Sequence, residues 1–179
     1  MGERDLKGRF FDRIARAVEL FAWEPGISVE VHPGPTRIAP YSLAVEATLD
    51  ADGTAATGRL VLLYDPAGGA GWDGTFRCVS MVNAPVDIET ATDPLLHEVG
   101  WTWFTDALVG CQATYREPAG TVTAVTGRGF GAKAAEDRAE IELRTSWTPV
   151  LKGELDIEAH LRAWEELLYL ASGTPELAG

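Results

Sequence analysis

The stretch Asp93–Val109, DPLLHEVGWTWFTDALV, predicts one buried helix with strand-rich sequence on both sides of it. Asp93 is a preferred N-cap residue, Pro94 fits the first helical position, and Gly110 suits the left-handed residue after a helix. On a helical wheel the polar residues form one narrow stripe, and apolar residues fill an arc of about 200°. A helix on the surface of a sheet needs only about half that width. We therefore predict a core helix that is covered by a sheet and, on another side, by a second helix or a second subunit.

The length and composition of the chain indicate a single domain that spans residues 1–179. The chain has 179 residues, 46% of them hydrophobic, and a formal net charge of −12 at pH 7. This length suffices for one domain with a hydrophobic core, and this composition is that of a globular protein. The acidic surface repels nucleic acid and anionic membranes at long range, which argues against both as partners.

The sequence features that bear on location favour the cytoplasm. No run of residues approaches the roughly 20 apolar residues of a membrane span. The N-terminus, MGERDLKGRF, lacks the apolar core of a signal peptide. Cys78 and Cys111 form neither a CxxC motif nor a metal-binding spacing, so we expect reduced thiols. One disulfide between the two cysteines is the alternative.

Hydrophobic periodicity predicts an α+β fold around the central helix. Helices are expected at Leu6–Ala22 and Asp156–Ala171. Strands are expected in two runs of three, with a further short strand suggested at Ile27–Val31: Tyr41–Asp50, Gly58–Asp65, Thr75–Asn83, Cys111–Arg116, Thr121–Thr126 and Arg138–Trp147. Short turns between strands favour antiparallel pairing. The predicted class is therefore α+β, with one or more antiparallel sheets of about six strands and N-terminal, central and C-terminal helices.

Two of these strands carry the clearest patterns. Arg138–Trp147 alternates strictly between apolar and polar residues, which predicts one dry face and one wet face. Gly58–Asp65 is more continuously apolar, which predicts a central strand that is buried on both faces. Between the first two strands of the second run, Glu117-Pro118-Ala119-Gly120 predicts a turn.

The loop Pro66–Gly74 is a candidate ligand site. Its four glycines match no phosphate-binding motif, and it joins two strands without opening a helix. A loop of this length can act as a flap over a pocket. The alternative is a structural hairpin connection in which Trp72 holds the loop against the core. The candidate ligand-binding residues are Asp65, Trp72, Asp73, Arg77 and Arg144.

Arg9, Arg13 and Arg16 are candidate partner-binding residues on one side of the N-terminal helix. They form a basic stripe that suits an acidic partner. Asp12 and Glu19 lie beside them, so the alternative is a solvated helix face whose charges are balanced locally.

Three further features raise hypotheses about binding. The backbone N–H groups of Gly127–Lys133 form either an anion-binding nest or an ordinary hairpin loop. His97 and His160 fall on the apolar sides of their helices, where a histidine is typically a satisfied core residue, although the two could meet as a pH-sensitive pair. His32, which precedes Pro33, is interpreted as a turn residue. We predict no metal site and no cofactor.

Several segments, in their order along the sequence, are similar to one known family. The matching motifs are Arg37-IAPY, Thr57-GRLVLLYDP, Trp72-DGTFR, Thr92-DPLLHEVGWTWF, Gly120-TVT, Ser146-WTP and His160-LRAW. The chain resembles the actinobacterial domain of unknown function family 3000 from about Arg37 to Gly173. The resemblance implies a cytoplasmic protein of an actinobacterium or a related genome, and it carries over no catalytic residues.

The lack of an assembled catalytic motif, the wide apolar arc of the central helix and the acidic surface lead to one principal hypothesis. The protein is expected to be a non-enzymatic binding or adaptor module that acts as a homodimer, with an unidentified protein as a possible further partner. The alternative is an enzyme or a small-ligand receptor with a pocket under the Pro66–Gly74 loop. A third hypothesis, nucleic-acid binding through the N-terminal arginines, is disfavoured by the net charge.

Overall fold

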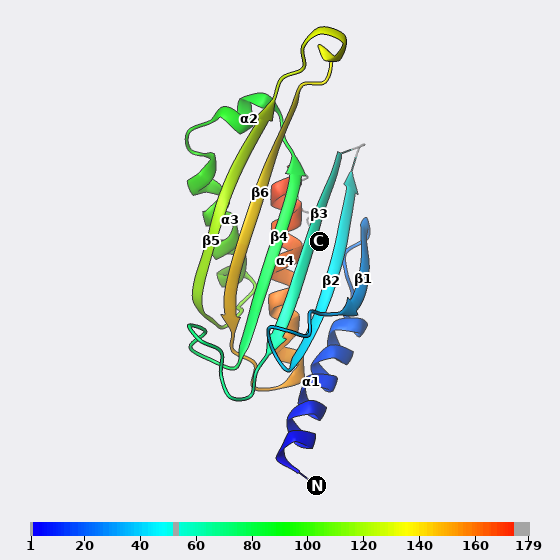
Figure 1. Cartoon of the computed structure of the whole chain (residues 1–179), viewed down its shortest axis with the longest axis vertical. Helices are drawn as coiled ribbons and strands as arrows, with labels where there is room; N and C mark the ends of the chain where they lie inside the picture. The colour runs from blue at the N-terminus through cyan, green and yellow to red at the C-terminus, as the bar shows by residue number, and fades with distance from the viewer. Residues whose placement is uncertain (1, 52–53, 174–179) are drawn as a thin grey trace.

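The chain forms one antiparallel sheet with helices against one of its faces (Figure 1). The structure, a computed structural model, describes residues 2–51 and 54–173. Its helices are α1 (Glu3–Leu20), α2 (Ile88–Thr92), α3 (Leu96–Gly110) and α4 (Ile157–Ser172). Its strands are β1 (Ile27–Pro33), β2 (Tyr41–Ala51), β3 (Thr54–Tyr64), β4 (Phe76–Pro85), β5 (Tyr115–Gly127) and β6 (Arg138–Pro149).

The predicted α+β class with six antiparallel strands is confirmed, in a single sheet with the order β1-β2-β3-β4-β6-β5. The strands are divided differently from the prediction, because four precede the central helices and two follow them. The first run gains β1, at the short segment suggested around Ile27–Val31. The second run loses a strand because Cys111 caps the end of α3 and β5 continues through the predicted turn at residues 117–120.

A β-bulge stands where the sequence predicted a turn in β5. The pairing of β5 with β6 shifts register between Arg116 and Ala119, and Glu117 adopts a left-handed φ of 50°. Proline lacks the N–H that a central strand needs, but Pro118 lies on an edge strand, where this loss is tolerated. The turn-forming residues produce a bulge here because the segments on both sides of them pair with the same strand.

The central helix α3 begins later than predicted. Asp93 caps the end of the short helix α2, and its carboxylate accepts a hydrogen bond of 2.9 Å from the Leu95 N–H just before α3. At the other end Gly110 is the last helical residue, and the left-handed position belongs to Gln112, with a φ of 59°. Helix α3 packs against β5 and α4, so the predicted cover by a sheet and a second helix is present.

The last helix, α4, is anchored over the middle of the sheet by Trp164. This side chain is 1% exposed, and its Nε1 donates a hydrogen bond of 2.7 Å to Ser80 Oγ on β4. On the neighbouring strand Gly58 provides space for the indole, since a Cβ atom there would lie 2.7 Å from Trp164 Cζ2. The apolar face predicted for this helix is confirmed, because all of its residues are buried: Ile157, Leu161, Trp164, Leu167 and Leu168.

The N-terminal helix α1 covers one end of the same face of the sheet through aromatic contacts. Phe11 stacks on Tyr64, with ring centroids 6.1 Å apart, and Tyr64 stacks on Phe76 at 4.3 Å. These rings continue the apolar layer beyond the end of α4.

The sheet therefore has a covered face and an open face. Along β6, Ile141 and Leu143 are buried toward the helices, whereas Glu142 and Arg144 project to the opposite side, as the alternation predicted. Figure 1 looks onto the open face, with α3 and α4 behind the strands. Strand β3 lies inside the sheet, but the prediction that it is buried on both faces is wrong at Arg59, which is exposed because none of the described helices covers the open face.

The substitution Gly58→Ala should destabilise the protein by about 1–3 kcal/mol, the usual cost of overpacking a core. The added methyl group has no free space, because the indole of Trp164 is buried and held by Ser80. Urea unfolding monitored by tryptophan fluorescence measures the loss.

Gly110→Ala is the matched control, because a Cβ atom at this position meets no heavy atom within 4 Å. This variant should be as stable as the wild type or more stable by up to about 1 kcal/mol. Equal stabilities of the two alanine variants would contradict the packing role of Gly58.

Candidate functional site

The open face contains a hollow that extends over β3, β4, β6 and β5. Its volume is about 500 Å³, and its floor consists of the side chains of Val61, Val79 and Met81 with the bare backbone of Gly120. Val79 is 44% exposed and Met81 37% exposed, although both lie on β4 in the interior of the sheet. The centre of the open face therefore presents apolar surface to solvent.

Two arginines flank the floor of this hollow. In the strand register Met81 lies directly opposite Arg59 on β3 and Arg144 on β6. Arg144 forms an ion pair with Glu142, two residues away on the same strand. Among the described residues Arg59 forms no ion pair. The hollow thus combines apolar surface and local positive charge on a protein whose net charge is −12.

The described residues that line the hollow include no His, Asp, Glu, Cys or Lys. The hydroxyl of the lining residue Ser146 accepts a hydrogen bond of 2.8 Å from Arg77 Nη2. The Ser80 hydroxyl lies on the covered face of the sheet, where it accepts the hydrogen bond from Trp164.

Arg77, one of the predicted ligand-binding residues, holds the β5 bulge in place. Its Nη1 donates to the Glu117 carbonyl oxygen at 2.8 Å and to Thr148 Oγ1 at 3.0 Å. With the bond to Ser146, these contacts tie β4 to β5 and β6. Burial lowers the pKa of Arg77, but a guanidinium stays protonated after such a shift.

The loop Pro66–Gly74 packs on itself and on β6. Trp72 lies against Gly69, where a Cβ atom would come within 2.0 Å of the indole, and the Trp72 carbonyl oxygen accepts a hydrogen bond from Thr148 Oγ1. Asp73 is exposed and adopts a left-handed φ of 53°. These contacts support the structural role that the sequence left open for Trp72.

A second hollow, of about 550 Å³, lies between the start of this loop and α1. Asp65 lines it together with Arg4, Lys7 and Tyr41, whereas the other predicted ligand-binding residues do not. Of the predicted set only Arg144 lines the hollow on the open face. The candidate residues are therefore distributed over two hollows, the β5 bulge and the Pro66–Gly74 loop and do not converge on one pocket.

The arginines of α1 are largely balanced by nearby carboxylates. Arg9 pairs with Asp5 at 3.3 Å, and Arg13 pairs with Glu154 at 3.8 Å. Arg16 is exposed to solvent. Local pairing reduces the net positive charge that this stripe offers to a partner.

Acidic residues that follow the glycine-rich loop Gly127–Lys133 contact the groups of this loop that were candidates for anion binding. The Gly129 N–H donates a hydrogen bond of 2.9 Å to Asp137 Oδ1, and Lys133 pairs with Glu136 at 3.8 Å. Groups that were candidates for an anion-binding nest thus already contact carboxylates of neighbouring residues.

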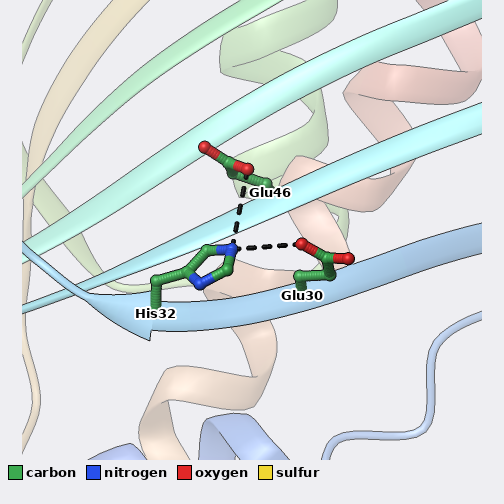
Figure 2. A group of neighbouring side chains, drawn as sticks. All are labelled: Glu30, His32 and Glu46. Atoms are coloured by element: carbon green, nitrogen blue, oxygen red, sulfur yellow. Dashed lines mark ion pairs between the residues drawn. The ribbon is translucent and has the colours of Figure 1, made fainter.

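A cluster that the sequence did not predict lies at the β1 edge of the open face (Figure 2). Glu30 and His32 on β1 and Glu46 on β2 direct their polar atoms toward one another. His32 was expected to be a turn residue, but β1 extends to Pro33 and includes it. The i, i+2 spacing of the first two residues was visible in the sequence, whereas Glu46 joins them only through the pairing of β1 with β2.

Comparison with known proteins identifies the family. A family model described as a protein of unknown function (DUF3000) matches residues 7–178. The chain belongs to the DUF3000 family. The resemblance of the sequence motifs to this family is thereby confirmed, and the match extends it to residue 7, within α1. No curated protein and no solved structure matches the chain.

Among the described residues, no helix is both long enough and apolar enough to cross a membrane.

The two helix histidines of this DUF3000 protein lie in different environments. The prediction that His97 lies on a buried face is wrong, because the apolar arc of α3 is wider than the face that β5 and α4 cover. His160 is 1% exposed, and its Nδ1 accepts a hydrogen bond of 3.0 Å from Trp147 Nε1. His160 is therefore a satisfied core histidine, as predicted, and its hydrogen bond from Trp147 is made without His97.

The buried position of His160 should make stability depend on pH. Burial lowers the pKa of His160 to about 4. The unfolded chain binds a proton at pH values where the folded chain keeps the imidazole neutral, so stability falls as the pH is lowered. Between pH 7.5 and pH 5 the expected loss is about 2 kcal/mol. Urea unfolding at the two pH values measures it.

Two variants isolate this contribution. His160→Asn retains an acceptor for Trp147 but no titrating group, so it should lose this part of the pH dependence. His97→Gln, at an exposed position, should behave like the wild type. If the His160→Asn and wild-type proteins showed the same pH dependence, the assignment would be wrong.

Proposed function

We propose that this protein is a non-enzymatic cytoplasmic binding module that holds a segment of a partner protein on the open face of its sheet. The observation that carries the proposal is the hollow at Val79 and Met81, where apolar side chains are exposed between two arginines. An apolar surface with a polar rim commonly marks an interaction site. The buried Cys78 thiol, which forms no disulfide, suits a reducing compartment.

The shape and charge of the hollow define the chemistry of the partner. Small-molecule pockets usually enclose most of their ligand, whereas this hollow is open along the face of the sheet. An extended protein segment can lay an apolar side chain on Met81 while a neighbouring carboxylate reaches Arg59 or Arg144. The flexible thioether of methionine adapts to different apolar shapes. We therefore expect a segment that carries apolar and acidic side chains next to each other.

Selection of random peptides displayed on phage, with the full chain as bait, tests this expectation. The enriched peptides should place an acidic residue beside one or more large apolar residues. Met81→Glu adds a negative charge between the arginines and should weaken the binding of an enriched peptide, measured by fluorescence anisotropy, at least about tenfold.

The matched control is Leu155→Glu, at a position that is 65% exposed and outside the hollow. This variant should bind the peptide as the wild type does. The proposal fails if no peptide is enriched, or if the enriched peptides bind Met81→Glu and the wild type equally well.

We also propose that two copies of the chain associate through α3. The outer surface of this helix exposes the apolar side chains Leu95 (59%), Val99 (41%) and Val109 (66%) among the polar residues Glu98, Thr102 and Asp106. Under a two-fold axis the same apolar side chains of two copies can pack against each other.

Sedimentation equilibrium over a range of concentrations measures this association. The wild type should approach the mass of a dimer, and the double substitution Val99→Glu and Val109→Glu should leave it monomeric because both copies would bury uncompensated charge. Leu20→Glu, on the exposed side of α1 at 68% exposure, should dimerise normally. A wild type that remains monomeric at all concentrations would exclude this dimer.

A further inference from the structure

Three metal-ligating side chains converge on the open face where β1 pairs with β2 (Figure 2). Glu30 and His32 are two residues apart on β1 and therefore lie on one side of this strand. Glu46 on β2 is the residue directly opposite Glu30. His32 Nε2 lies 3.2 Å from Glu30 Oε2 and 3.6 Å from Glu46 Oε2, and the donor atoms of all three lie within 4.8 Å of one another.

We propose that Glu30, His32 and Glu46 bind a divalent transition-metal ion. One imidazole nitrogen and two carboxylate oxygens form a donor set that Zn²⁺ accepts. Tetrahedral ligands at about 2.0–2.1 Å from Zn²⁺ lie about 3.3 Å from one another. The separations of 3.2 and 3.6 Å around His32 Nε2 are close to this value. Small rotations of the exposed glutamate side chains bring the third pair of donors together, and water takes the fourth position.

The electrostatics of the cluster favour a cation at this point. Carboxylates that face each other on paired strands repel, and Glu30 faces Glu46. Within the described ranges of the chain, His32 is the only basic residue at ion-pair distance from either glutamate; Arg59 lies opposite Glu46 on β3 but forms no ion pair with it. A histidine compensates negative charge only when it is protonated. A divalent ion compensates both carboxylates and uses the neutral imidazole as a ligand.

The backbone that carries these ligands is fixed by strand pairing. Strand β1 pairs with β2 over the whole stretch from Ile27 to Pro33, and β2 is held on its other side by β3. Ligands on paired strands are held more precisely than ligands on loops, which favours binding. This proposal does not rest on the partner binding proposed for the hollow, because none of the three ligands lines it.

Isothermal titration of the untagged full chain with Zn²⁺ at pH 7.5 tests the site. The expected result is one ion per chain with a dissociation constant in the micromolar range. His32→Gln and the pair Glu30→Gln with Glu46→Gln should each weaken binding at least about tenfold, and all three positions are exposed, so these variants should fold. Ca²⁺ at the same concentration should not compete, because it prefers six or more oxygen ligands.

Two matched controls exclude other ligands. His97→Gln removes the other exposed histidine, and Cys111→Ser removes the thiol that is not fully buried. Both variants should bind Zn²⁺ as the wild type does. Absence of saturable binding, or equal affinity in the wild type and His32→Gln, would overturn the proposal.

Nuclear magnetic resonance of the imidazole groups distinguishes a metal from a proton as the occupant. The chain has three histidines, so each ring can be followed separately. Zn²⁺ should shift the ring resonances of His32 and leave His97 and His160 unchanged. A His32 ring that stays protonated at pH 7.5 and does not respond to Zn²⁺ would show a protonated bridge between the glutamates, and the metal site would be refuted.

Discussion

The buried hydrogen bond from Trp164 to Ser80 fixes the helix layer on the sheet. A buried indole N–H must find an acceptor, and Ser80 supplies one on a face that is otherwise almost entirely apolar. The ring also needs a gap in the sheet, which Gly58 provides on the adjacent strand. The donor lies on α4, the acceptor on β4 and the space for the ring on β3. Together these three features fix the distance of α4 from the sheet and its position over the strands.

A second tryptophan strengthens this arrangement from the sheet side. Trp147 on β6 donates a hydrogen bond to His160 on α4, whereas Trp164 on α4 donates one to Ser80 on β4. Two indole hydrogen bonds thus join the same helix to two neighbouring strands. With α4 over the centre of the sheet, α3 lies over β5 and α1 at the end. Every long helix thus packs on one face. Antiparallel hairpins allow this, because they need no helical crossover on the opposite face.

Those parts of the fold that follow from local periodicity were predictable from the sequence. The alternation in β6 and the apolar face of α4 each depend on residues of one element alone. The β5 bulge was not predictable, since a turn and a bulge use the same residue types and differ only in which strand the flanks pair with. His97 was misplaced because the apolar arc of α3 exceeds the face that its neighbours cover.

The candidate sites depended still more on pairing across strands. Arg144 was in the predicted ligand-binding set, but its neighbours Met81 and Arg59 come from two other strands. Val79 and Met81 are apolar residues of a predicted strand, and they are exposed because none of the described helices covers the open face. Glu46 joins His32 by register alone. Sequence periodicity predicts on which face of the sheet a side chain lies. The identity of its neighbours on that face can be predicted only when the strand order and register are known.

The strand register also connects the two proposed sites. Glu30, Glu46, Arg59, Met81 and Arg144 occupy one continuous row across five strands of the sheet. Glu46 and Arg59 lie opposite each other on adjacent strands and form no ion pair, so the two exposed charges attract each other only at longer range. A divalent ion on Glu46 would cancel that negative charge and leave Arg59 more attractive to a carboxylate in the hollow. If both sites bind as proposed, linkage requires the converse, and an acidic segment on Arg59 would favour the ion equally.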